Sequence, residues 1–349
     1  MKVIGSSSLL PPLRSIAVGG LLWLAAIAHP GRRAAQNTMA ATPGSSWRED
    51  SDEMPLSSHQ SLPLQDPVAM IRQRDYPRAE KNLSEYLLIH PDAAEAHFLL
   101  GYTLYREDKA RASLAEYTTG ARFHKPEAND LAVVAMDYIL LHDYAGADRW
   151  LRQAVAWSPE NSLYRYYLGR TQYAENRFQE AIESFNKCLA LQPRNVKAEY
   201  NLGLAWEGLD HNADAVQAYR TAIAWQQTLA KQDPQPYLDL GILQLHQGQV
   251  TEAEGSLQTA ASLDKQNPKI HEELGEAYEQ LKKLAQAQAE LETAASLAPN
   301  VPSLHFELGR IYQREGLRGK AQEQFARCAA LSASHSTDSA ETPNPEVPR

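Results

Sequence analysis

The sequence predicts an all-α protein built as a solenoid of stacked helical pairs, and three observations support this prediction. Alanine, leucine, glutamine and glutamate are plentiful, and all four have high helix propensity. A leucine–glycine pair, or a small residue in its place, recurs at steps of 34 residues five times and of 38 once. A second small residue follows each of these positions by 12 residues, and a bulky residue lies four further on. Several series with one period indicate a repeat array, in which each unit packs on its neighbours.

The repeated positions set the register of the array. The first small residue falls at Gly101, Ala135, Gly169, Gly203, Gly241, Gly275 and Gly309. The second falls at Ala79, Ser113, Ala147, Ala181, Ala215, Ala253, Ala287 and Ala321. The bulky residue falls at Leu83, Tyr117, Leu151, Phe185, Tyr219, Leu257, Leu291 and Phe325. We expect the small residues to lie where two helices cross closely, with the bulky residue filling the adjoining gap.

These spacings, with prolines at a common phase, resemble the pattern W-x₂-L-G-x₂-Y…A-x₃-F…P of the tetratricopeptide repeat over about residues 60–335. The unit-closing prolines are Pro91, Pro159, Pro193 and Pro299. The family tryptophan is replaced at His97, Leu131, Arg165, Glu199, Tyr237, His271 and His305. The resemblance implies a right-handed superhelical solenoid of about eight helix-turn-helix units that binds proteins and is not an enzyme.

We expect the array to span 67–335 and to begin with a degenerate first unit that has Asp66-Pro67 in place of Leu-Gly. The predicted units are about 60–93, 94–127, 128–161, 162–195, 196–233, 234–267, 268–301 and 302–335. The 38-residue step places four extra residues around Thr228 to Gln232. Since four residues are about one helical turn, we expect them to extend the second helix of that unit.

The N-terminus predicts export. Lys2 and Arg14 precede an apolar run of 13 residues, 16–28, which ends in the A-x-A pattern Ala26-Ile27-Ala28. We expect residues 1–28 to be a cleaved signal peptide of a bacterial protein that is periplasmic or secreted. Arg32 and Arg33 keep open an inner-membrane anchor formed by residues 16–28. Residues 29–66 and 336–349 lack periodicity and are expected to be a disordered linker and a disordered tail.

Composition and motifs exclude several other functions. The formal net charge is −9, which argues against a nucleic-acid partner because such proteins carry a basic stripe. Metal-ligand, nucleotide-binding and nucleophile motifs do not occur, so we expect no catalytic residue, metal, cofactor or small-molecule substrate. Histidines 97, 271 and 305 share one repeat position, where stacking is the simpler explanation. The two cysteines, Cys188 and Cys328, are expected to be buried hydrophobic residues.

The resemblance implies that the first helix of each unit lines a concave groove that holds a partner peptide. Helical spacing predicts an aromatic strip with two arginines on this surface. The predicted groove residues are Phe98, Tyr102, Tyr105, Arg106, Tyr166, Arg170, Tyr173 and Tyr200. An acidic stripe at Glu272, Glu276 and Glu279 is the alternative surface.

The favoured function is therefore a protein–protein interaction scaffold in the cell envelope that binds a partner protein or peptide. Two alternatives stay open: a structural or self-associating solenoid whose groove is filled by its own tail, and a membrane-anchored assembly factor. An enzyme subunit that uses the repeats to hold substrate has no motif to support it.

Overall fold

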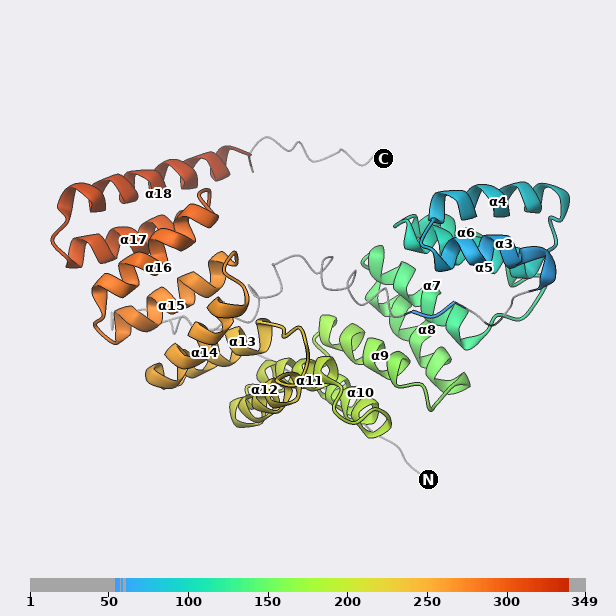
Figure 1. Cartoon of the computed structure of the whole chain (residues 1–349), viewed down its shortest axis with the longest axis horizontal. Helices are drawn as coiled ribbons and strands as arrows, with labels where there is room; N and C mark the ends of the chain where they lie inside the picture. The colour runs from blue at the N-terminus through green and yellow to red at the C-terminus, as the bar shows by residue number, and fades with distance from the viewer. Residues whose placement is uncertain (1–53, 57, 59–60, 339–349) are drawn as a thin grey trace, which may run out of the picture. The chain divides into compact units, whose positions relative to one another are not determined.

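The computed structural model describes residues 54–56, 58 and 61–338, without the side chains of 334–338. This part of the chain contains 16 α-helices and one short 3-10 helix, and no strand (Figure 1). The helices are η2 (Leu62–Leu64), α3 (Gln65–Arg72), α4 (Tyr76–Ile89), α5 (Ala94–Arg106), α6 (Ala110–Gly120), α7 (Ala128–Leu140), α8 (Tyr144–Trp157), α9 (Ser162–Ala174), α10 (Phe178–Leu191), α11 (Val196–Gly208), α12 (Asn212–Gln226), α13 (Gln235–His246), α14 (Val250–Leu263), α15 (Pro268–Gln280), α16 (Leu284–Leu297), α17 (Pro302–Arg314) and α18 (Arg318–Asp338).

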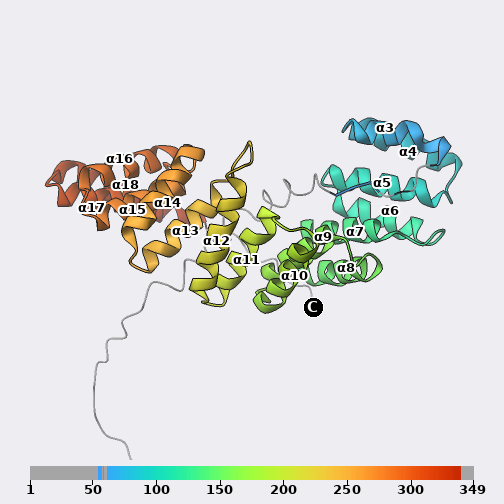
Figure 2. The same cartoon turned by 60° about the horizontal axis from the view of Figure 1, so that its bottom comes forward.

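The predicted fold class is confirmed. Each helix packs on the next along the chain, and α3 to α18 form eight consecutive pairs (Figure 2). First helices also contact one another across unit boundaries, as α5 does with α7, α9 with α11 and α13 with α15. This succession of packed pairs is the arrangement that a solenoid requires.

The small and bulky repeat positions meet as expected. A Cβ atom at Gly203 in α11 would lie 2.5 Å from Cε1 of Tyr219 in α12. A Cβ atom at Gly169 would likewise lie 2.6 Å from Cε1 of Phe185. The absence of a side chain at the crossing therefore allows an aromatic ring to lie against the neighbouring helix backbone.

The turn inside each unit contains a residue in the left-handed region. Examples are Asp108 and Asn176, with φ of 60° and 59°, and Gly248, with φ of 74°. These residues follow the C-cap of a first helix, where a left-handed residue terminates the helix and reverses the chain. Asparagine, aspartate and glycine tolerate this conformation better than other residues.

The histidines of the shared repeat position form hydrogen bonds. Nδ1 of His271 lies 2.7 Å from Oε2 of Glu290 in α16, and its Nε2 lies 3.1 Å from the carbonyl oxygen of Lys265. His97 bridges Glu116 and Pro91 in the same way, and His305 bridges Gln324 and Pro299. Hydrogen bonding to the preceding loop and to the second helix is what the three rings share, and His97 also stacks on Phe123. Each ring ties the loop before its unit to the second helix of that unit.

Three sequence expectations need correction. The four extra residues do not extend α12, which ends at Gln226; residues 227–234 form a loop instead. The Gln226 side chain holds this loop through two hydrogen bonds to the backbone of Asp233, of 3.0 and 2.8 Å. Cys188 is buried as expected, whereas Cys328 is only partly buried. The predicted tail begins too early, because α18 continues to Asp338.

The expected linker also needs correction at its C-terminal end. The side chains of Met54 and Leu64 are each only 2% exposed, and α3 already begins at Gln65. Part of the segment 54–66 is thus packed against the array. The predicted signal peptide at 1–28, linker residues 29–53 and tail residues 339–349 lie outside the described residues.

Candidate functional site

The first predicted groove residue, Phe98, lies in the core of its unit. It is 1% exposed and stacks on Tyr117 with ring centroids 5.9 Å apart. A Cβ at Gly120 in α6 would lie 2.7 Å from Cε1 of Phe98, so the ring fills the space beside this glycine. Phe98 is therefore a packing residue and offers no surface to a partner.

The strip residues of α9 are also largely enclosed. The Tyr166 ring lies near those of Tyr167 and Phe185, with centroid distances of 5.4 and 6.3 Å. Arg170 is 8% exposed, and its guanidinium carbon lies 5.7 Å from the Tyr166 ring centroid. Tyr173 is half-buried against Phe178, and burial raises its pKa. Their packing supports the fold directly, and a binding role for them remains a prediction.

Tyr200 links two units. Its hydroxyl donates to Oδ2 of Asp239 in α13, at 2.5 Å. Gln235 donates to the same carboxylate at 3.2 Å. Burial raises the pKa of Asp239 to about 7 and that of Tyr200 well above its usual value. This hydrogen-bonded cluster gives Tyr200 a structural role at the junction of α11 and α13.

The remaining strip residues lie on α5, where Tyr102 contacts a segment from before the array. Tyr102 and Tyr105 are 5% and 4% exposed. The Tyr102 hydroxyl donates to the carbonyl oxygen of Met54 at 3.0 Å, and Arg106 Nη1 donates to that hydroxyl at 3.2 Å. At this end of the strip the first-helix surface therefore has an identifiable occupant.

The occupant is a docked segment, consisting of Met54, Pro55, Leu56 and Ser58. The side-chain amide of Asn129 donates to the Pro55 carbonyl. The Ser58 amide donates to Oε2 of Glu127 at 3.0 Å, and its hydroxyl donates to Oε1. Together with Tyr102, side chains of α5, α7 and the residue before α7 thus hold the segment mainly through its backbone. Just beyond it, the Ser61 amide donates to Oε1 of Glu95 at 2.6 Å.

Local structure places Glu127 and Asn129. Glu127 is the N-cap of α7 and forms a capping box with Asp130, whose carboxylate accepts from the Glu127 amide at 2.7 Å. Asn129 is in the first turn of α7, and its Oδ1 accepts from the Tyr164 hydroxyl at 3.4 Å. Sequence reasoning missed both residues because they lie at the start of the helix, before the aromatic strip. The available signal was the E-x-x-D start pattern followed by a long apolar helix.

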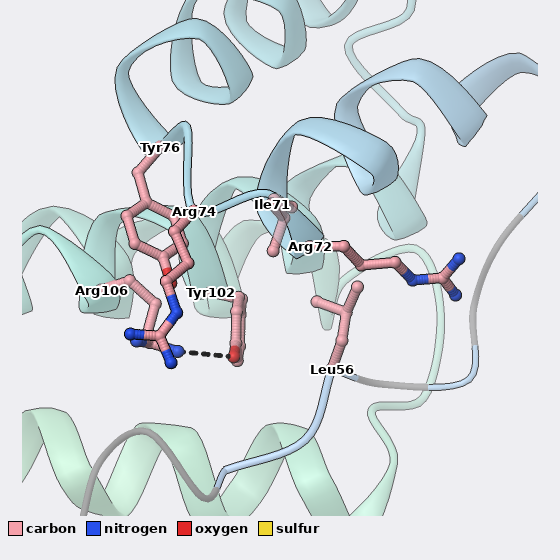
Figure 3. Close-up of a pocket in the computed structure, with 7 residues that line it drawn as sticks. All are labelled: Leu56, Ile71, Arg72, Arg74, Tyr76, Tyr102 and Arg106. Carbon is pink, nitrogen blue, oxygen red and sulfur yellow. Dashed lines mark hydrogen bonds between the residues drawn. The ribbon is translucent and has the colours of Figure 1, made fainter. Parts of the chain in front are cut away.

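A pocket of about 380 Å³ lies beside the docked segment (Figure 3). Arg74 and Arg106 approach each other on one side of Tyr102, and Leu56 lies on the other side (Figure 3). The Arg106 guanidinium carbon is 5.0 Å from the Tyr76 ring centroid. The full lining is Leu56, Ile71, Arg72, Arg74, Tyr76, Tyr102 and Arg106. The site therefore combines apolar and aromatic walls with three cationic side chains.

The alternative acidic stripe is partly neutralised. Oε1 of Glu279 accepts from Arg310 at 2.7 Å and from Arg314 at 2.6 Å. Glu272 accepts from Lys269 at 2.8 Å. Burial and the neighbouring Glu272 and Glu276 raise the pKa of Glu307 to about 7. Within the described residues, no cluster of three or more His, Cys, Asp or Glu side chains is arranged to hold a metal ion.

Comparison with protein families agrees with the geometry. Residues 69–123, 162–195 and 244–305 each match a family model described as tetratricopeptide repeat. The chain contains tetratricopeptide repeats. No curated protein matches this repeat protein significantly over its sequence.

Solved structures with the same fold are numerous. The C-terminal part of a TPR repeat-containing protein from Cytophaga hutchinsonii has 13% identity and a TM-score of 0.57, covering 70% of this chain and 99% of its own. PilF of Pseudomonas aeruginosa has 17% identity and a TM-score of 0.53, covering 64% and 98%. PilW, a type IV pilus biogenesis factor, has 22% identity and a TM-score of 0.52, covering 58% and 92%. These likenesses establish the fold of the tetratricopeptide array. Among the described helices, none combines the length and apolar character needed to cross a bilayer.

Proposed function

We propose that this protein is a protein–protein interaction scaffold that binds an extended segment of a partner on the first-helix surface of its repeats. The docked segment carries this proposal. Side chains from α5 and α7, together with the N-cap Glu127, hold the backbone of a non-helical stretch of chain. Hydrogen bonds from a rigid helical frame to a peptide backbone are a general basis for peptide binding. The expected binding surface thereby moves from the strip between Phe98 and Tyr200 to its α5 end and the start of α7.

We further propose that the protein acts in the bacterial cell envelope after export. The apolar run at 16–28 and its A-x-A ending support this location. The intact mass of the protein recovered from an envelope fraction tests it. A mass that begins after Ala28 supports cleavage, whereas a full-length species in the inner membrane supports the anchor formed by residues 16–28 instead.

The binding proposal is tested with the full chain as bait in an envelope extract. Both the wild type and the Met54→Asp variant are used, because a buried charge is costly and should release the docked segment. The captured partner is then purified and titrated calorimetrically. Tyr102→Phe combined with Asn129→Ala removes two hydrogen bonds to backbone, worth about 1 kcal/mol each, so affinity should fall by roughly tenfold or more.

Asn201→Ala is the matched control, because Asn201 is only partly buried on α11 and its side-chain amide donates to the Lys197 carbonyl of its own helix. Its affinity should equal that of the wild type. Equal affinity for the Tyr102/Asn129 double variant would place the binding surface elsewhere. If neither bait captures a protein and gel filtration shows dimers, the self-associating solenoid is the better reading.

A further inference from the structure

We infer that the surface over α5 and α7 recognises an extended peptide of the form acidic–apolar–proline–apolar–x–serine, and that the docked segment occupies this site in cis. The inference rests on the proposed function, because it names the ligand class of the same surface. It also makes the chain its own competitor, so that a partner gains access only when the docked segment leaves.

Backbone contacts fix the path and direction of the peptide. Tyr102 and Asn129 donate to two consecutive carbonyls, those of Met54 and Pro55, and Glu127 accepts from the Ser58 amide. These contacts are available to any extended peptide that follows this path. They supply affinity, and the side chains must supply selectivity.

Side-chain contacts define three of the preferred positions. Met54 is 2% exposed, so this position requires an apolar side chain. Leu56 lines the pocket with Ile71 and Tyr102, which favours a second apolar residue. The Ser58 hydroxyl donates to the Glu127 carboxylate, which favours a hydroxyl donor and disfavours an acidic residue there.

Proline at the middle position suits the site for a different reason. Its fixed φ predisposes the peptide to an extended conformation and lowers the entropy lost on binding. Pro55 is held only through its carbonyl in the contacts described above, so the missing N–H costs nothing.

Charge defines the N-terminal end of the peptide. The Tyr102 hydroxyl that donates to the Met54 carbonyl also accepts from Arg106, so Arg106 stands at the Met54 end of the site. Arg72 and Arg74 line the same pocket. The sequence directly before Met54 carries four carboxylates, at Glu49, Asp50, Asp52 and Glu53. Carboxylates at these positions complement a pocket with three arginines, and this attraction should weaken with salt.

Competition in cis follows from the short connection to the array. The docked segment ends at Ser58, and η2 begins at Leu62. A segment tethered this closely has an effective concentration in the millimolar range. If the free peptide binds with a Kd of ~100 µM, a cis competitor of equal intrinsic affinity at ~1 mM weakens binding in trans by roughly tenfold.

Fluorescence anisotropy of an acetylated, dye-labelled peptide spanning residues 49–61 tests the inference. The receptors are the wild-type full chain and the Met54→Asp/Leu56→Asp variant, in which two charges disfavour cis docking. The released variant should bind the peptide roughly tenfold or more tightly than the wild type. In the released background, Asn129→Ala should weaken binding about fivefold and Tyr102→Phe should act in the same direction, each by loss of one hydrogen bond. Asn201→Ala should leave binding unchanged.

A second peptide, with its four acidic residues replaced by glutamine or asparagine, tests the charge preference. It should bind more weakly at low salt and lose less affinity as salt rises. Circular dichroism of each receptor verifies the helical fold.

Equal peptide affinity for the wild-type and released chains overturns cis competition, as does binding that survives both Asn129→Ala and Tyr102→Phe. If the peptide fails to bind any receptor while an envelope partner still binds in a Tyr102- and Asn129-dependent manner, the ligand class is wrong and the proposed function stands. If the peptide binds as expected but no partner is captured, the site assignment stands and the scaffold function fails.

Discussion

Replacing Gly203 by alanine adds one methyl group at the closest approach of α11 and α12. An ideal Cβ at this position lies 2.5 Å from Cε1 and 2.6 Å from Cδ1 of Tyr219. Carbon atoms in favourable contact are about 3.5–4.0 Å apart, so the ring or the helices must shift by roughly 1 Å. The Tyr219 ring is fully buried, and its hydroxyl donates to Glu207 at 2.7 Å, which opposes a shift.

Two effects of opposite sign determine the net change in stability. Alanine is better than glycine in a helix interior by about 1 kcal/mol. Overpacking a closely packed site costs about 1–3 kcal/mol. We expect overpacking to prevail, with a net loss of about 1 kcal/mol and a fall in the thermal midpoint of about 2–4 °C.

Gly255 in α14 provides the matched control, because nothing lies within 4 Å of a Cβ built there. Gly255→Ala gains the helix propensity without the contact and should raise the midpoint. Thermal melts followed by circular dichroism at 222 nm compare the two alanine variants with the wild type. A Gly203→Ala midpoint equal to that of Gly255→Ala would refute the close crossing and the repeat register on which it rests.

Three further predictions concern buried polar groups and thiols. Burial raises the pKa of Asp137 to about 8, against ~3.9 in an unfolded chain, even though Ser113 donates to its carboxylate. Between these two pH values the native state holds the proton that the unfolded state has lost, so the free energy of unfolding falls as pH rises through this window. Thermal melts from pH 4 to 9 should therefore show a smaller decline of the midpoint for Asp137→Asn than for the wild type. Burial also raises the pKa of the Cys188 thiol to about 11. Under native conditions at pH 8, iodoacetamide should therefore label Cys328 before Cys188, which peptide mass spectrometry can verify. Equal labelling of the two thiols would contradict the burial of Cys188. His271→Ala removes the bridge between α16 and the preceding loop and should lower stability by about 1–3 kcal/mol in denaturant titrations, whereas an unchanged midpoint would show that the bridge contributes nothing.

The register of the repeats could be predicted from the sequence because its signal is local. Gly203 and Tyr219 are 16 positions apart, and every unit after the first repeats this spacing with a small residue followed by a bulky one. The period thereby identifies which small residue meets which bulky one, and the contact at 2.5 Å bears this out. The 38-residue step was visible in the sequence too. That its extra residues form a loop after α12 depended on the hydrogen bonds between the Gln226 side chain and the Asp233 backbone.

The candidate site was predicted only in part. Phe98 and Tyr102 lie four residues apart on α5, and helical spacing assigned both to one exposed surface. Phe98 instead fills the space beside Gly120, whereas Tyr102 meets the docked segment. Periodicity gives the direction of a side chain around its own helix axis, but it does not say which neighbouring helix or segment covers that direction.

The sequence by itself determined the helical pairs, their number and the positions where they cross, because these depend on residue size and spacing within about 34 residues. Only the tertiary structure decided that Met54 and Leu56 pack against the array, since a short apolar stretch among polar residues offsets its ordering entropy only where a surface is ready to receive it. The hydroxyl of Tyr102 and the amide of Asn129 provide that surface, and they come from helices whose contacting residues lie 48 and 74 positions from the segment that they bind.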